Sequence, residues 1–174
     1  MTKQEYQAAA CYWEEKDADS VKLEQSKLRP MVEEYIQSNN TGALATGTED
    51  YVRCTPIEYS WHDGCFWMFS EGGKKFIGLE KNPNVCLAIY DKYEGFGKLH
   101  GMQVMGTAEL VEPFSPRYNA HAAHKKISLE VLRNLSTPMH LICVRPTRID
   151  CLFSDFKKLG CAPRQTLFLE EGSR

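Results

Sequence analysis

The chain has 174 residues, 43% of them hydrophobic, and a formal net charge of −2. This length suffices for one domain with its own core, so we expect a single domain over residues 1–174. The near balance of acidic and basic residues excludes the overall positive charge typical of nucleic-acid-binding proteins. We therefore expect no nucleic-acid partner, and any cationic site must be local.

The N-terminus and the cysteines bear on the cellular compartment. The first residues lack both the apolar core of a signal peptide and the Arg-rich composition of a transit peptide, and no apolar run approaches the length of a membrane span. The seven cysteines include no Cys-x-x-Cys pair, whereas disulfide frameworks and zinc ribbons repeat short spacings. We expect a cytoplasmic protein without membrane contact, in which most thiols are buried.

Two helical patterns open the chain. The first covers residues 3–15 with weak capping signals, and the second covers residues 26–37 and stops at the polar residues 38–40. Pro30 lies inside the second pattern and favours a helix that begins just before it. We expect an N-terminal helical arm over about residues 1–38.

After Asn40 the hydrophobic period becomes that of strands. His62-Asp63-Gly64 predicts a tight hairpin, because Asp-Gly supplies positive φ angles. Strands are expected over residues 41–46, 51–61, 65–70, 85–90, 102–111, 139–144, 148–153 and 166–169, and helices over 75–81, 115–125 and 129–135. Mostly sequential strands with few helices indicate a mainly β fold with peripheral helices, an antiparallel barrel rather than a βαβ sheet.

The segment Ser70-Glu-Gly-Gly-Lys-Lys75 joins an aromatic strand to a short helical pattern and predicts an anion-binding loop. Two glycines let the backbone approach a ligand, a helix N-terminus offers unpaired N–H groups, and two lysines add charge. A phosphorylated cofactor is the expected guest. The alternative is an ordinary polar loop, since Gly-Gly-Lys also occurs there.

Three segments of residues 41–111 occur in a characteristic order and spacing: LATGTEDYVRCTPIEYSW, DGCFWMFSEGGKKFIGLEKNPNVCLAIYD and GMQVMGTAELVE. In this order they resemble the pyridoxamine 5′-phosphate oxidase-like family, the FMN-binding split β-barrels. This resemblance implies a six-stranded antiparallel split β-barrel and a homodimer with FMN at the subunit interface.

The resemblance also implies the cofactor-binding residues. Arg53 matches the family's arginine near the FMN phosphate, and Lys74 and Lys75 match its basic pair. Gln103 matches a glutamine that faces the flavin, whose mixed ring edge suits an amide that both donates and accepts. The other implied contacts are Cys54, Thr55 and Pro56 through their backbone, and Phe69, Ser70 and Gly73 around the loop.

The chain also departs from the true oxidase. Glu58 stands where the oxidase has a lysine that holds its phosphorylated substrate, and the oxidase's Arg-Pro-x-x-Ser and C-terminal Arg-x-His segments are absent. Oxidation of pyridoxamine phosphate is therefore not expected. A flavin-dependent reductase for a small uncharged or cationic acceptor fits better.

Other kinds of site have less support. His121 and His124 lie three apart on a predicted helix and could share a metal, but no Glu-x-x-His pattern or cysteine ligand accompanies them, so we expect no metal site. We expect His62, in the hairpin turn, to be exposed. No local pattern marks an activated cysteine nucleophile. The aromatic side chains around residues 59–69 are expected in the core, with Phe69 nearer to the site.

The sequence thus predicts an FMN-binding flavoprotein that reduces a small acceptor with hydride from NAD(P)H, the flavin itself carrying the hydride. No catalytic side chain is assigned, because Tyr59, Glu58 and water are all possible proton donors. The rival prediction is a non-catalytic split barrel that holds flavin or haem, in which one of the five histidines would ligate the haem iron.

Overall fold

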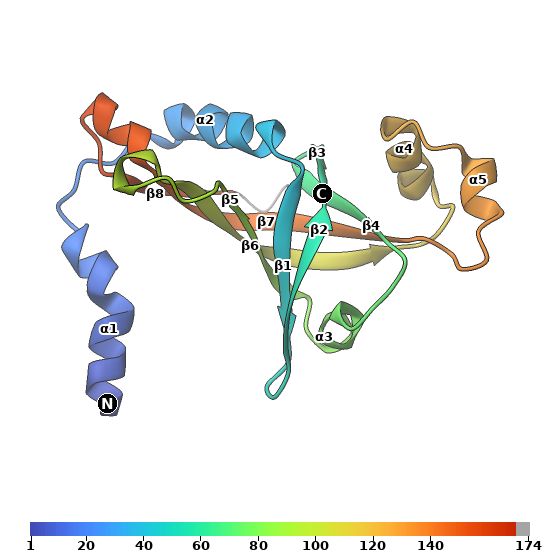
Figure 1. The fold of residues 1–174 in the computed structure, drawn as a ribbon, viewed down its shortest axis with the longest axis horizontal. Coiled ribbons are helices and arrows are strands. Elements are labelled where there is room, and N and C mark those ends of the chain that lie inside the picture. The colour runs from blue at the N-terminus through green and yellow to red at the C-terminus, as the bar shows by residue number, and fades with distance from the viewer. Residues whose placement is uncertain (170–174) are drawn as a thin grey trace.

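Eight antiparallel β-strands form one sheet that curves into an open half-barrel (Figure 1). The computed structural model describes residues 1–169. The strands are β1 (Thr41–Gly47), β2 (Val52–Glu58), β3 (Ser60–His62), β4 (Cys65–Ser70), β5 (Asn84–Tyr90), β6 (His100–Val111), β7 (His140–Phe153) and β8 (Arg164–Phe168).

Helices lie around this sheet (Figure 1). They are α1 (Lys3–Lys16), α2 (Gln25–Ser38), α3 (Lys75–Lys81), α4 (Pro116–His124) and α5 (Leu129–Arg133), with 3₁₀ turns η1 (Phe96–Lys98) and η2 (Ser154–Leu159). None of the helices within residues 1–169 is long and apolar enough to cross a membrane.

The strand order is β2-β1-β5-β6-β7-β4-β3, with β8 also paired to β7. The predicted mainly β, antiparallel fold with peripheral helices is confirmed, although the described residues form eight strands where the family resemblance implied six. The predicted strand over residues 51–61 ends at Glu58, and the chain resumes as the short strand β3. In this order β2 is an edge strand, so one row of its backbone groups is not used by the sheet.

β7 is one long strand where two were predicted. Pro146, which has no backbone N–H, lies opposite a shift in register between Met105 and Gly106 of β6. At this irregularity a Cβ on Gly106 would lie 2.3 Å from the carbonyl oxygen of Arg145, so the residue must be glycine. Strand pairing with β6 therefore carries β7 through a proline that would otherwise end it.

The main core lies between α2 and one face of the sheet. Leu28, Val32 and Ile36 repeat at helical spacing and are fully buried against strand residues such as Leu44 and Leu87. A second cluster packs α4 and α5 against the β4–β7 part of the sheet; its buried members are Cys65, Trp67, Val111, Tyr118, Ala122, Leu132, Leu141 and Cys143. The two cores fix the positions of β4 and the loop that follows it.

The helical arm differs from expectation in detail. Pro30 is the sixth residue of α2, not part of its first turn. α1 has a complete capping box between Thr2 and Glu5, although weak capping was predicted, and it buries no residue. Figure 1 shows α1 extending away from the sheet and joined to the body at its C-terminal end.

Candidate functional site

The loop between β4 and α3 has the backbone geometry that its glycines predict. Gly72 and Gly73 have φ angles of 137° and 103°, a region that residues with a Cβ rarely adopt. The Ser70 hydroxyl accepts a hydrogen bond from the Gly72 N–H at 3.1 Å and contacts the Gly72 carbonyl at 3.2 Å. Ser70 and the glycines therefore form a tight turn that leads directly into α3.

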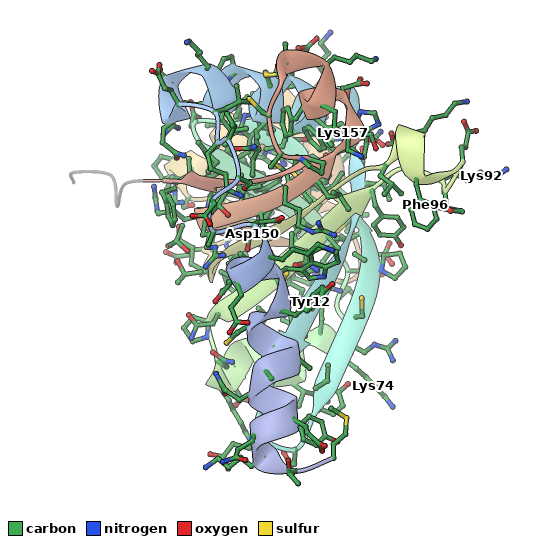
Figure 2. All side chains as sticks on the ribbon, turned by 90° about the vertical axis from the view of Figure 1, so that its left-hand side faces the viewer. Tyr12, Lys74, Lys92, Phe96, Asp150 and Lys157 are labelled. Atoms are coloured by element: carbon green, nitrogen blue, oxygen red, sulfur yellow. The ribbon has the colours of Figure 1, made fainter. Side chains whose placement is uncertain are left out.

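The two lysines of this loop point in different directions. Lys75 is only 6% exposed and its Nζ donates to the Gly72 carbonyl. Lys74 is exposed, and Figure 2 shows its side chain at the rim of the molecule. Burial, and secondly the positive charge of Arg53, lower the pKa of Lys75. The structure thus distinguishes the two lysines, which the sequence could not.

Arg53 and Lys75 place two positive charges near each other without a negative partner. Within residues 1–169, neither side chain forms an ion pair with a carboxylate. A buried ammonium group is costly unless its charge is paired and its donors are satisfied, and Lys75 has only the Gly72 carbonyl as acceptor for its three N–H donors. An anion bound between these two side chains would relieve both the desolvation of Lys75 and its repulsion from Arg53.

Two threonines on the same side of the sheet add unused hydrogen-bonding groups. Thr46 pairs with Arg53 across β1 and β2, and Thr55 lies two residues further along β2, so all three side chains share a face. The Oγ1 atoms of Thr46 and Thr55 are buried and have no partner among the described residues. Because buried polar atoms are normally satisfied, these hydroxyls fit a site completed by a ligand. The sequence analysis did not identify Thr46.

α3 is seated on this side through Gly78. A Cβ at Gly78 would lie 2.8 Å from the backbone nitrogen of Gly47 and 2.9 Å from the Cβ of Thr46. Only glycine therefore allows α3 to lie this close to β1. This contact sets the distance between strand β1, which carries Thr46, and Lys75, the first residue of α3.

Cys54, Pro56 and Gln103 lie on the opposite face of the sheet. Successive side chains of β2 alternate between faces, and the pairing of Pro56 with Ala43, Ala43 with Ala88, and Ala88 with Gln103 forms one row across four strands. Cys54, Pro56 and Gln103 are all exposed. The predicted site residues therefore form two groups, which a ligand could join only around the free edge of β2.

Phe69 is not part of either group. Its half-buried ring packs against Tyr118 and His121 of α4, with centroid separations of 5.4 and 4.9 Å. The predicted position near the site holds only for its backbone, which precedes Ser70. Tyr59, one of the possible proton donors, is buried and donates to the Ile36 carbonyl at 2.9 Å. Burial raises its pKa, so it is poorly placed for proton transfer.

A histidine cluster lies on the α4 side of the sheet and was missed by the sequence analysis. The prediction that His62 is exposed is wrong, because its side chain is 17% exposed and stacks on Trp67. Its Nε2 lies 3.0 Å from Nδ1 of the buried His121, and its ring lies 4.2 Å from that of His124. Only the long-range packing of α4 on the β3–β4 hairpin brings these rings together.

The same region holds the residue with reversed charge. Glu58 forms an ion pair of 2.7 Å with Lys125, which follows α4. Burial, together with the neighbouring His62, His124 and Lys125, lowers the pKa of His121 to about 4. Within residues 1–169 no three His, Cys, Asp or Glu side chains are arranged to hold a metal ion. All seven cysteines are free.

An antiparallel half-barrel with a cationic, glycine-turned loop after its fourth strand defines the class of this protein as a split β-barrel. The family model for pyridoxamine 5′-phosphate oxidase matches residues 28–152. The chain therefore belongs to the pyridoxamine 5′-phosphate oxidase family, as the resemblance predicted. No curated protein matches the sequence.

Solved structures share the fold. General Stress Protein 26 from Bacillus anthracis is 21% identical, with a TM-score of 0.58 over 82% of this chain and 98% of the other. A FAD-binding protein from Mesorhizobium loti is 19% identical (TM-score 0.54; 67% and 88%). The haem storage protein HutZ from Vibrio cholerae is 18% identical (TM-score 0.57; 72% and 91%). At these identities the likeness concerns the fold alone.

Proposed function

We propose that this protein is an FMN-binding flavoprotein that transfers electrons from a reduced nicotinamide to a small acceptor. The observation that carries the proposal is the buried Lys75 beside Arg53, two cations with no carboxylate partner within residues 1–169. An FMN phosphate carries close to two negative charges and forms strong charge-assisted hydrogen bonds with such groups. The unpartnered hydroxyls of Thr46 and Thr55 would add neutral donors.

The remaining residues have roles that follow from their positions. The free edge of β2 offers the backbone groups of residues 54–56, and Gln103 offers an amide on the outer face. Gly72 and Gly73 have no side chains, so a phosphate can approach the backbone of the turn that follows Ser70. When bound, FMN supplies the hydride-transfer chemistry, and the protein binds and orients it.

We further propose a homodimer in which the outer face of the edge strand β2 is covered by a second copy. Val52 on this face is 80% exposed, and Cys54 and Pro56 beside it are also exposed. Large exposed apolar side chains grouped on a sheet mark an interaction surface. In a dimer, the loop-side and outer-face groups of two copies could contribute to one site. Family membership supports this assembly.

The absorption spectrum of the purified protein tests the function directly. We expect the bands of oxidised flavin after incubation with FMN and desalting, and their bleaching when NADH or NADPH is added without oxygen. Flavin bands that do not bleach with either nucleotide would contradict the oxidoreductase proposal and leave a flavin carrier. A protein that retains no flavin would contradict the whole proposal.

Haem binding is the second candidate, and the fold shared with a haem storage protein supports it. His100 is the histidine most suited to ligate haem iron, because it is partly exposed and its Nδ1 lies 3.7 Å from Asp91, while Nε2 would exchange Asp155, at 3.5 Å, for the iron. A carboxylate partner orients a ligating imidazole. A Soret band after haem addition that disappears in His100→Ala would favour this candidate over flavin.

A further inference from the structure

A chamber of about 820 Å³ lies between α1 and the outer face of strands β5–β8. This volume is within the range of small-molecule sites. Figure 2 views the chamber region from the α1 side and shows Asp150 above the end of the helix that carries Tyr12. Gln103, which is assigned above to the outer face of the cofactor site, lines this chamber as well.

The floor of the chamber is flat. Ala88 contributes a single methyl group to the floor, and Gly101 has no side chain. A Cβ at Gly101 would lie 3.3 Å from the Cβ of Tyr90, its partner across β5 and β6, so a larger residue would fit poorly. The side chain of Tyr90 is largely exposed beside this bare stretch of sheet. Small residues in a row on a sheet let a planar molecule lie close to the backbone.

The wall opposite the sheet is aromatic. Trp13 of α1 is 44% exposed and lines the chamber, and the guanidinium of Arg164 stacks 3.3 Å from the centre of its indole. Arg164 also lies 3.8 Å from Asp17, just after α1. Because α1 buries no residue of its own, the Trp13–Arg164 stack and this ion pair are what hold the helix over the sheet.

The three aspartates that line the chamber have partners within the protein, whereas Glu14, Lys22 and Lys92, which also line it, form no ion pair among the described residues. Asp150 accepts from Arg148 at 2.9 Å and from the Thr166 hydroxyl at 2.7 Å. Asp17 lies beside Arg164, and Asp91 accepts from the Tyr35 hydroxyl at 2.8 Å. In contrast, the exposed Gln103 amide has no hydrogen-bond partner among the described residues. The chamber thus offers the Gln103 amide as a donor and acceptor group beside the bare stretch of the sheet.

We propose that this chamber binds the electron acceptor, and that the acceptor is a planar aromatic molecule such as a quinone. Its ring lies between the Ala88–Gly101 floor and Trp13, and a ring carbonyl accepts a hydrogen bond from the Gln103 amide. The inference rests on the proposed function, because the row from Pro56 to Gln103 is what places the chamber next to the flavin.

The test uses the full-length protein loaded with FMN and duroquinone, a benzoquinone whose four methyl groups prevent addition of cysteine thiols. Equilibrium dialysis measures its binding to the oxidised protein. We expect Trp13→Ala to weaken this binding about tenfold, through loss of an aromatic contact and of the Arg164 stack that holds α1 over the sheet. Tyr12→Ala, which removes a neighbouring exposed aromatic side chain outside the chamber lining, should change binding less than twofold.

Flavin occupancy, measured in parallel, should be equal in all three proteins, since α1 carries none of the proposed FMN contacts. Equal duroquinone binding by wild type and Trp13→Ala would overturn the inference, as would equal losses in the two variants. A Trp13→Ala effect on subunit assembly instead of binding would also overturn it, because the partner subunit would then fill the chamber. If no flavin is retained, the proposed function fails, whereas duroquinone binding to the same protein still tests the chamber through the Trp13 and Tyr12 comparison.

Discussion

The two sides of strand β4 contain two clusters of ionisable groups that differ in how their charges are satisfied. Around α4, the histidines contact one another, His62 contacts Asp63 at 2.8 Å, and Glu58 pairs with Lys125. Around α3, Lys75 and Arg53 have no such partner within residues 1–169, and two threonine hydroxyls are unused. A cluster that satisfies its own groups stabilises the fold, whereas one that leaves them unpaired is complete only with a ligand.

Removing the two cations tests the α3 side most severely. Arg53→Met combined with Lys75→Met should weaken FMN binding by at least about 100-fold, because each charge-assisted hydrogen bond contributes about 1.5–3 kcal/mol. Titration of the flavin-free protein with FMN, followed by flavin fluorescence, measures the change. Without FMN the variant should be at least as stable as wild type, since a desolvated ammonium is removed.

Lys74→Met is the matched control for that pair. It removes the same charge from the exposed neighbour and should weaken FMN binding less than about threefold, because exposed charges interact weakly. If Lys74→Met lowered affinity as much as Lys75→Met, the contrast between the inward and outward lysines would be wrong.

The contribution of the α4 side to the free energy of unfolding should depend on pH. The pKa of His121 is lowered from 6.5 to about 4 in the folded protein, so the unfolded chain binds the additional proton between these values. Stability should be full above about pH 6.5, decline as the pH falls toward 4, and then level off with respect to this group. Urea denaturation at pH 7.5, 6 and 5 measures the free energy of unfolding.

His121→Phe keeps a ring against Trp67 and Phe69 but cannot be protonated. Its free energy of unfolding should depend less on pH between 7.5 and 5 than that of wild type. His62, His124 and Lys125 face this position and contribute to the lowered pKa of His121. An unchanged slope in His121→Phe would show that the cluster is not the origin of the acid sensitivity.

The smallest expected effect concerns the unused hydroxyls. Thr55→Val should leave the flavin-free protein unchanged or up to about 1 kcal/mol more stable, because the buried hydroxyl it removes has no partner. FMN affinity should fall about three- to tenfold, as expected for one neutral hydrogen bond. Thr107→Val, an exposed strand position on β6, serves as the control and should change neither quantity.

Local signals predicted the part of the fold that carries the loop. β4 and α3 have the predicted bounds, because the Asp63-Gly64 turn, with positive φ at both residues, and Asn82-Pro83 define their limits from neighbouring residues alone. β7 was divided in the prediction, since a proline normally ends a strand, and only its pairing with the irregular part of β6 shows why it continues.

The candidate site, like the fold, was predictable where it depends on residues close together in the sequence. Arg53, Thr55 and the glycine loop follow from the family pattern, and the structure brings Arg53 near Lys75. The direction of each lysine, the hydroxyl of Thr46 and the environment of His62 depend on residues distant in the sequence. His62 and His121 are 59 positions apart, so no local pattern indicates their contact.

The close seating of α3 on β1 means that ligand affinity can change through a residue that touches no ligand. Any side chain at position 78 would lift the helix from Gly47 and Thr46, and Lys75 would move with it. Homologues with alanine or serine there should hold their phosphate group differently even where every contacting residue is identical. Comparisons of binding preference within the family should therefore include this buried spacer position alongside the contact residues.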